Sequence, residues 1–307
     1  MLHRLVVAAL LTAGLVAQQP TRRTSDPFAA IREELRAARS ELATLRDLDL
    51  PERSRSSGSF GVDFTTHYLF RGIPQEDRGV IAQPWFEWNL RLADERCPVG
   101  PVDFTLGTWN SLHDGPTGGA GSIWYENDVY GGFGANVLDR LRANLRYTSY
   151  HSPNAGFPTV QEVSGSLTFT DGWLLSGGLQ PTVALAFETR GQADGGDERG
   201  SVWELGLEPT QTLGHLGRLE CLASLPVKVG LGMHGYYESP TGGSAATFGY
   251  ASIGLTMALT LPVGDGWPSP WRLEVSLAGV TLGDTNRERN GGERNELVGT
   301  IGISSSF

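Results

Sequence analysis

Two pairs of residues in the sequence have the types that acid–base or nucleophilic chemistry requires. His67 shares a strand face with Asp63, and Ser149 shares one with His151 near the end of a period-2 stretch. A serine hydroxyl beside an imidazole can attack an ester, but the imidazole also needs a third group to orient it. Asn154 is close in sequence yet does not make a convincing third group. We therefore predict no catalytic residues, with a lipid hydrolase as the less favoured alternative.

Ligand-binding motifs are equally sparse. The acidic stretch DGGDE at 194–198 could hold a cation only weakly, because it lacks the spacing of a complete calcium loop. The glycine stretches GGAGS and TGGSA precede no helix, so they lack the helix N-terminus that cradles a phosphate. The net charge of -10 argues against a nucleic-acid partner. The sequence therefore predicts no metal, no cofactor and no nucleic acid.

The two cysteines, Cys97 and Cys221, are the remaining reactive side chains. An exported compartment would allow a disulfide between them. In the predicted order of strands, however, they lie on opposite walls, and a disulfide needs Cα atoms within about 7 Å. Free thiols are therefore the favoured prediction, and a bridge is the alternative.

The first 58 residues differ from the rest of the chain. Residues 1–17 have a short basic start, an apolar core and a cleavable Ala17, which is typical of a secretory signal peptide. Residues 18–58 hold a polar linker and a predicted helix over 27–48, where apolar residues recur at alternating spacings of three and four. This periplasmic, coiled-coil-like helix could join copies of the chain into a homo-oligomer, or stay a single helix under or inside its own pore.

From residue 59 to the end, apolar residues alternate with a period of two, which is typical of β-strands. Polar, glycine-rich connections alternate with mostly shorter ones, so we place the longer ones outside the cell and both chain ends in the periplasm. After residue 17 no apolar run is long enough for a membrane helix. The twelve predicted strands are 59–71, 80–93, 101–111, 121–135, 140–150, 159–169, 173–188, 201–212, 218–235, 246–261, 270–282 and 294–307.

The outward faces of these strands combine an aliphatic band with aromatic residues at both ends. Two aromatic girdles around such a band are typical of transmembrane barrels, whereas a soluble β-sandwich would show only the alternation. The predicted fold class is therefore all-β, a transmembrane antiparallel up-and-down β-barrel of 12 strands over 59–307. The expected girdles are Phe60, Phe104, Phe133, Phe169, Trp173, Trp271 and Phe307 at one end, and Tyr68, Phe70, Tyr125, Tyr147, Phe187 and Trp203 at the other.

The chain ends on Phe307, after a strand in which Leu297, Ile301 and Ile303 share its parity. A barrel in lipid must pair its last strand with its first, because an open edge would leave backbone groups unsatisfied. The ending resembles the C-terminal signal of bacterial outer-membrane barrels, a final Phe after alternating apolar residues. The resemblance implies that Phe307 is an assembly signal for the barrel assembly machinery. It also implies a place among the lipids of the outer membrane of a Gram-negative-type bacterium.

A second resemblance lies in the first hairpin, VDFTTHYLFRGIPQEDRGVIAQPWFEW. Its Phe70-Arg71-Gly72 turn, followed by Gln75, is similar to the aromatic-Arg-Gly turn of the TorF-type porin family. The stretch YENDVYGGFG resembles an acidic strand of the same family, and the likeness covers most of 58–307 loosely. This resemblance implies a small outer-membrane barrel with a pore function.

Charged residues occur on the inward faces, because lipid would not tolerate them on the outward ones. By this register the lumen holds eleven acids and six bases, an excess of five negative charges, and acidic pore walls favour cations. An open lumen predicts a porin for passive diffusion of small polar solutes with a weak cation preference. A filled lumen would instead make a closed structural or loop-presenting binding protein. The predicted pore-lining residues are Asp63, His67, Glu87, Arg91, Glu126, Asp128, Arg142, Arg146, Glu162, Glu204, Glu208 and Lys228.

Overall fold

The structure is a computed structural model, and it describes residues 54–94, 99–138, 140–172, 175–217, 219–261 and 270–307. The chain divides into two units, Met1–Arg53 and Ser54–Phe307, and every described residue belongs to the second. The predicted signal peptide and the helix at 27–48 lie outside the described residues, so both stay predictions. Within the described part of the chain, no helix is long and apolar enough to cross a membrane.

One antiparallel sheet of fourteen strand segments forms the wall of the second unit, and a separate two-stranded hairpin accompanies it. The hairpin consists of β2 (Tyr68–Phe70) and β3 (Ile73–Glu76). The wall segments are β1 (Ser56–Thr65), β4 (Ile81–Ala93), β5 (Val99–His113), β6 (Trp124–Val137), β7 (Leu141–His151), β8 (Val160–Phe169), β9 (Thr182–Arg190), β10 (Ser201–Leu207), β11 (Thr210–Leu216), β12 (Leu219–Ser224), β13 (Val227–Met233), β14 (Phe248–Leu261), β15 (Trp271–Leu282) and β16 (Asn295–Ser306).

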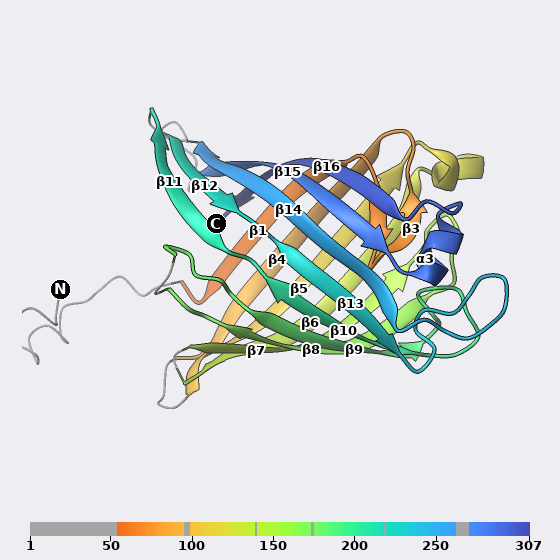
Figure 1. Cartoon of the computed structure of the whole chain (residues 1–307). Coiled ribbons are helices and arrows are strands. Elements are labelled where there is room, and N and C mark those ends of the chain that lie inside the picture. The colour runs from red at the N-terminus through yellow and green to blue at the C-terminus, as the bar shows by residue number, and fades with distance from the viewer. Residues whose placement is uncertain (1–53, 95–98, 139, 173–174, 218, 262–269) are drawn as a thin grey trace, which may run out of the picture. The chain divides into compact units, whose positions relative to one another are not determined.

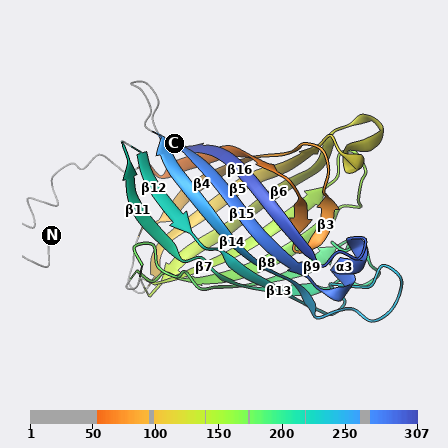
Figure 2. The ribbon, with the colours of Figure 1, turned by 45° about the horizontal axis from the view of Figure 1, so that its top comes forward.

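The sheet closes on itself, because β1 pairs with β16 on one side and with β4 on the other. Segments β10 and β11 form one wall strand interrupted at Pro209, and β12 and β13 form another interrupted at Pro226. Proline cannot donate a ladder hydrogen bond, which explains both interruptions. The wall therefore has twelve strands, and the predicted closed 12-strand antiparallel barrel is confirmed. Figures 1 and 2 show the strands running obliquely around the ring.

Side chains of one parity point away from the wall and form an apolar belt. Phe64, Leu297 and Ile301, on adjacent strands, are 46%, 61% and 48% exposed. At the end of the barrel that holds Phe307, which we call the terminus end, the ring of Phe60 packs edge-on against Trp271 with centroids 5.6 Å apart. Aromatic rings beside an aliphatic belt suit the headgroup layer of a bilayer.

The last residue closes the seam between β1 and β16. The N–H of Phe307 donates to the carbonyl of Gly58 at 2.8 Å, and the N–H of Gly58 donates back at 2.9 Å. The Phe307 ring covers Gly58 so closely that an added Cβ would lie 2.5 Å from a ring carbon. A side chain at position 58 would therefore displace the terminal ring.

The opposite end, which we call the loop end, carries the long connections between strands. Two of them contain short helices, a 3-10 helix η1 (Pro116–Gly121) and an α-helix α3 (Asp284–Arg289). The remaining described stretches between strands at this end are 66–80, 152–159, 191–200 and 234–247.

The first predicted strand, 59–71, is wrong beyond Thr65, where the chain leaves the wall. It then forms the β2–β3 hairpin, which lies inside the ring of strands at the loop end (Figures 1 and 2). Tyr68 and Phe70 therefore do not join the outer girdle. Tyr68 is only 8% exposed, and Phe70 packs on the buried clusters inside the barrel.

The expected girdle position of Tyr125 is also wrong, because β6 has a bulge there. Ser111 pairs with Glu126 while its neighbour Leu112 pairs with Trp124, so Tyr125 has no partner of its own. A bulge of one residue exchanges the two faces of a strand. Trp124 is consequently 43% exposed, whereas Tyr125 is 6% exposed.

Candidate functional site

The β2–β3 hairpin, together with its turn, is the candidate functional site, and we call it the plug hairpin. Arg71 at its tip donates two hydrogen bonds of 2.8 Å to the carboxylate of Glu162 on β8. Its Nε lies 3.4 Å from an oxygen of Glu204 on β10. The Arg71 side chain is 12% exposed. One largely buried guanidinium thus contacts two wall carboxylates, and its bidentate geometry on Glu162 fixes the tip in place.

The turn that presents Arg71 has an uncommon backbone. Arg71 and Gly72 both have positive φ, +50° and +79°, between the paired residues Phe70 and Ile73. A two-residue hairpin with positive φ at both positions is a type I′ turn, which favours Asn-Gly over Arg-Gly. A long side chain in this region is unfavourable by itself, so contacts elsewhere hold it there. The ion pairs of Arg71 supply those contacts.

Aromatic side chains from the 234–247 connection fasten the plug hairpin from a third side. The Tyr236 hydroxyl accepts a 2.8 Å hydrogen bond from Arg71, and the Tyr237 hydroxyl donates to the Arg71 carbonyl at 3.0 Å. Both tyrosines are essentially fully buried. Burial raises the pKa of Tyr236 well above its usual range, so its hydroxyl stays neutral.

Apolar packing also holds the plug hairpin against the wall at this end. Ile73 joins Ala186, Val202 and the two tyrosines Tyr236 and Tyr237 in one buried cluster. A second cluster joins Tyr68 to Ile81 and Tyr125, and a third places Leu69 against Tyr250, Val280 and Leu282. The plug hairpin therefore contacts the wall around much of its circumference, in the manner of a small hydrophobic core.

The far strand of the plug hairpin ends on Glu76, which ties it to η1. The Glu76 carboxylate accepts hydrogen bonds from the N–H and hydroxyl of Thr117, at 2.8 and 2.7 Å. It also accepts the N–H groups of Asp77 and Arg78, each at 3.0 Å. The Thr117 hydroxyl in turn contacts His113 Nδ1 at 2.6 Å. A single carboxylate thus joins the plug hairpin to the neighbouring connection.

This contact predicts a pH dependence. Burial acts to raise the pKa of Glu76, but the hydrogen bonds from Thr117, Arg78 and Asp77 outweigh it and lower the pKa below 4.5. The ionised group therefore stabilises the contact fully above pH 4.5, and this contribution is lost as the pH falls below that value. We expect hydrogen-exchange protection of the Thr117 amide to fall as the pH is lowered below 4.5. The Gly232 amide, which donates to the Thr247 carbonyl, is the control and should not respond.

A Glu76→Gln variant sharpens this test. Its uncharged amide cannot titrate, so protection of Thr117 should be lower at neutral pH and independent of pH. Protection that follows the same pH curve in wild type and variant would assign the titration to another group.

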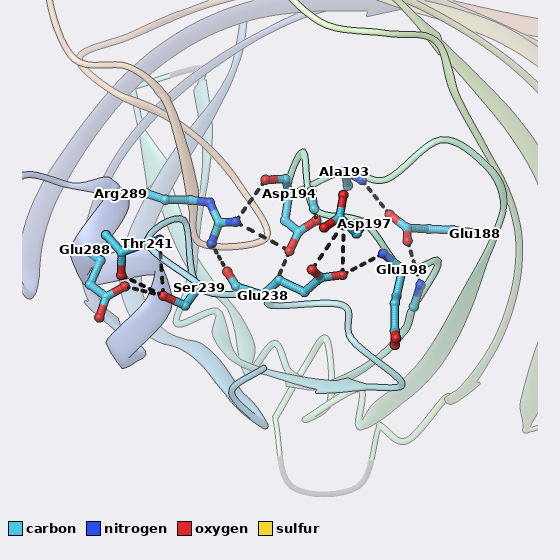
Figure 3. A network of polar contacts seen from close by, with 12 residues as sticks. Glu188, Ala193, Asp194, Asp197, Glu198, Glu238, Ser239, Thr241, Glu288 and Arg289 are labelled. Atoms are coloured by element: carbon cyan, nitrogen blue, oxygen red, sulfur yellow. Dashed lines mark hydrogen bonds and ion pairs between the residues drawn. The ribbon is translucent and has the colours of Figure 1, made fainter. Parts of the chain in front are cut away.

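Three connections at the loop end are tied together by a second polar network, which we call the loop clasp (Figure 3). The Asp194 carboxylate accepts a 2.6 Å hydrogen bond from the Glu238 N–H. The Glu238 carboxylate in turn accepts hydrogen bonds from the N–H groups of Asp197 and Glu198. Arg289 of α3 donates to the carbonyls of Glu238 and Asp194, at 2.6 and 2.9 Å. Because Glu238 follows Tyr236 and Tyr237 directly, the clasp holds the same segment that fastens Arg71.

Three of the predicted pore-lining acids lie buried beside the plug hairpin. Glu126, Asp128 and Glu162 are 4%, 8% and 2% exposed. Glu126 accepts a 2.8 Å hydrogen bond from the Tyr68 hydroxyl. Asp128 Oδ1 has no hydrogen-bond partner among the described residues. In this state these three side chains therefore face packed protein rather than an open channel.

The other predicted residues lie along the wall strands, and several of them form ion pairs. Arg142 donates to Asp103 at 2.9 Å, and Arg91 lies 3.9 Å from the same carboxylate. Arg146 lies 3.8 Å from Glu87 and 4.4 Å from the Tyr130 ring centroid. Asp63 lies opposite Gly302 and Gln83 in the wall. Glu204 accepts a hydrogen bond from the Tyr250 hydroxyl, and Lys228 is exposed. Glu208 and Arg272 line a cavity of about 220 Å³.

The residues that sequence patterns put forward for catalysis are only partly brought together. His67 pairs with Glu296 at 3.4 Å, not with Asp63. Ser149 Oγ lies 2.9 Å from His151 Nε2, and the other ring nitrogen lies 3.3 Å from the Thr159 hydroxyl. A neutral hydroxyl cannot stabilise an imidazolium as a carboxylate does, and Asn154 bonds to the Thr117 carbonyl instead. This geometry gives a hydrolase no support.

The described residues contain neither a metal-binding cluster nor a disulfide. Across the described ranges, no group of three or more His, Cys, Asp or Glu side chains could hold a metal ion. Cys221 is a half-buried free thiol, and Cys97 lies outside the described residues.

Sequence patterns did not identify several residues of the site. Tyr236, Tyr237 and Arg289 lie in connections, where no periodicity marks a buried side chain. The one available signal was Arg71 before Gly72, because a long residue in a predicted tight turn is unusual.

No family model matches the chain, and no curated protein matches its sequence. The chain is similar to the translocator domain of the autotransporter NalP from Neisseria meningitidis, at 14% identity, covering 90% of this chain and 96% of that chain with a TM-score of 0.39. It is also similar to the β domain of the Bordetella autotransporter BrkA, at 12% identity, covering 82% and 98%, with a TM-score of 0.41. The NanC porin gives 11% identity, 81% and 98% coverage, and a TM-score of 0.39. These neighbours are outer-membrane β-barrels, and the resemblance to the TorF-type family stays a prediction.

Proposed function

We propose that the chain is a non-catalytic outer-membrane channel for small polar solutes, held closed by its plug hairpin in the state described. The observation that carries the proposal is Arg71, which joins the hairpin tip to Glu162 and Glu204 on two different wall strands. Beyond the plug hairpin the lumen is lined by charged and polar groups such as Arg142 and Asp103. Such a lining serves water and solutes rather than a dry core.

The contacts that hold the plug hairpin in the lumen can be broken without breaking the barrel wall. The plug hairpin belongs to no wall strand, since β2 and β3 pair only with each other. It can therefore leave the lumen without breaking any hydrogen bond of the barrel ladder. Buried ion pairs also gain less free energy than their geometry suggests, because both charges lose hydration. Displacement of the plug hairpin is accordingly a conformational change rather than unfolding.

Conductance of the full-length protein in planar bilayers tests the proposal. We expect long closed periods interrupted by openings, since opening requires the plug hairpin to move. Steady conductance typical of a wide pore would contradict the closed state, and complete silence under all voltages would contradict the channel. The open channel should prefer cations weakly, because acids outnumber bases in the lumen, and reversal potentials across a salt gradient measure this. Clear anion preference would overturn that part of the proposal.

A permanently closed barrel that presents its connections to a binding partner is the second candidate. The loop clasp favours it, because Asp194 and Arg289 are only 1% and 13% exposed and order three connections at once. If neither the wild type nor variants that weaken the plug hairpin conduct in planar bilayers, this second function is favoured.

A further inference from the structure

A small pocket opens at the loop end, between the plug hairpin and the 152–159 and 191–200 connections. Its volume is about 70 Å³. Pro158 and Gly195 at its border are exposed, whereas Glu126 on its lining is 4% exposed. The pocket therefore runs from solvent down to a buried carboxylate.

Three aromatic rings from three separate elements line this pocket: Phe70 of the plug hairpin, Tyr150 of β7 and Phe157 of the following connection. Phe70 and Tyr150 meet nearly edge to face, with centroids 5.3 Å apart. The amide side chains of Gln75 and Gln192 also line the pocket. Aromatic faces attract cations through their quadrupole, most strongly where water is excluded. The Arg71 guanidinium already lies 5.0 Å from the Phe70 centroid, so Tyr150 and Phe157 are the rings available to a further cation.

The carboxylates below the rings lack a cation of their own. Arg71, the guanidinium of the plug hairpin, is used by Glu162 and Glu204. Glu126 receives a hydrogen bond from the hydroxyl of Tyr68 and shares a second hydrogen bond with the side chain of Asp128. The neighbouring Asp128 is more than nine-tenths buried, and its Oδ1 has no partner among the described residues. A hydrogen bond between two carboxyl groups needs a proton on one of them, so the pair keeps one negative charge, and its burial is costly unless a cation or another donor reaches it.

We propose that this pocket binds a small organic ammonium ion, with its charge at Glu126 and its apolar part between Phe70, Tyr150 and Phe157. A volume of about 70 Å³ admits about five non-hydrogen atoms, if one water-sized probe takes roughly 10–15 Å³. An alkylammonium ion of that size fits both the volume and the lining, which combines a buried acid with aromatic rings. The inference stands apart from the proposed channel, because binding can be measured without conduction.

Butylammonium is the probe, with 1-butanol and butyrate as its neutral and anionic counterparts. Isothermal titration of the full-length protein in a non-ionic detergent should show butylammonium binding at least about tenfold more tightly than 1-butanol, which is about 1.4 kcal/mol. Butyrate should not bind. Equal affinity for butylammonium and 1-butanol would overturn the proposal, since it would reduce the pocket to an apolar crevice.

Two variants test whether the ammonium ion binds in this pocket. Glu126→Gln keeps the side-chain size and an acceptor for Tyr68, and should weaken butylammonium binding about tenfold or more. Phe157→Leu, in a connection outside the wall, keeps bulk but removes a ring, and should weaken it several-fold. Glu87→Gln removes the same charge elsewhere in the lumen and should have no effect. Unchanged binding in Glu126→Gln and Phe157→Leu, or an equal loss in Glu87→Gln, would refute the assigned site.

Discussion

Replacing Arg71 with alanine is expected to convert the closed barrel into a conducting one. The change leaves Glu162 and Glu204 without their shared guanidinium, at 3% and 20% side-chain exposure. Removing one partner of a buried ion pair costs about 3–5 kcal/mol. The ratio of open to closed channels should therefore rise by about two orders of magnitude or more, since each 1.4 kcal/mol is about tenfold. Open probability in single-channel recordings measures the effect.

Two further variants separate the plug hairpin from a general change of lumen charge. Arg146→Ala removes a lumen cation whose side chain is 46% exposed and lies 3.8 Å from Glu87, so it should leave the open probability near the wild-type value. A triple variant, Arg71→Ala with Glu162→Gln and Glu204→Gln, removes the stranded charges as well. We expect it to close again in part, because neutral amides need no counter-ion. An Arg71→Ala channel with the same open probability as the wild type would show that Arg71 does not hold the plug hairpin closed.

Deleting Phe307 is expected to reduce the amount of barrel in the outer membrane severely, well beyond a small loss of stability. The deletion removes both backbone hydrogen bonds with Gly58 and the ring that covers it. The seam that closes the barrel would then lose its last contacts at the terminus end, and an edge of β1 would be left unpaired. Heat-modifiable mobility of the folded barrel in outer-membrane fractions gives the measurement.

Substitution at Gly58 distinguishes the seam from a recognition signal. Gly58→Leu leaves the chain end intact but displaces the Phe307 ring. If assembly depends on recognition of the terminal residue, this variant should reach the membrane more efficiently than the deletion. Normal outer-membrane levels of the deletion variant would contradict a role for Phe307 in assembly.

The wall of the barrel could be predicted from sequence because a two-residue period is a local property. Phe60, Val62 and Phe64 have the same parity, and their strand lies where the alternation places it. The same parity continues through Tyr68 and Phe70, yet these residues turn into the lumen. Alternation shows only which side chains are shielded from water. Lipid outside the barrel and packed protein inside the lumen both shield them, so the pattern cannot tell the two apart. The bulge at Tyr125 has no marker in the alternation either.

The candidate site was less predictable because it depends on pairs that are far apart in the chain. Arg71 meets Glu162 across 91 residues and Tyr236 across 165. The acidic stretch around Asp194 suggested a weak cation site, whereas its carboxylates accept backbone N–H groups and one arginine. Only the fold tells whether a loop carboxylate meets water, a metal or an amide.

The distant partners of Arg71 have a consequence for the order in which the molecule is built. The type I′ turn involves neighbouring residues, so the plug hairpin can form on the microsecond timescale of isolated hairpins. It cannot dock until β8, β10 and the segment with Tyr236 have taken their places, and these come much later in the chain. Loop closure over such separations delays long-range contacts. The hairpin therefore forms before its docking site exists, and that site is complete only once the segment with Tyr236 is in place.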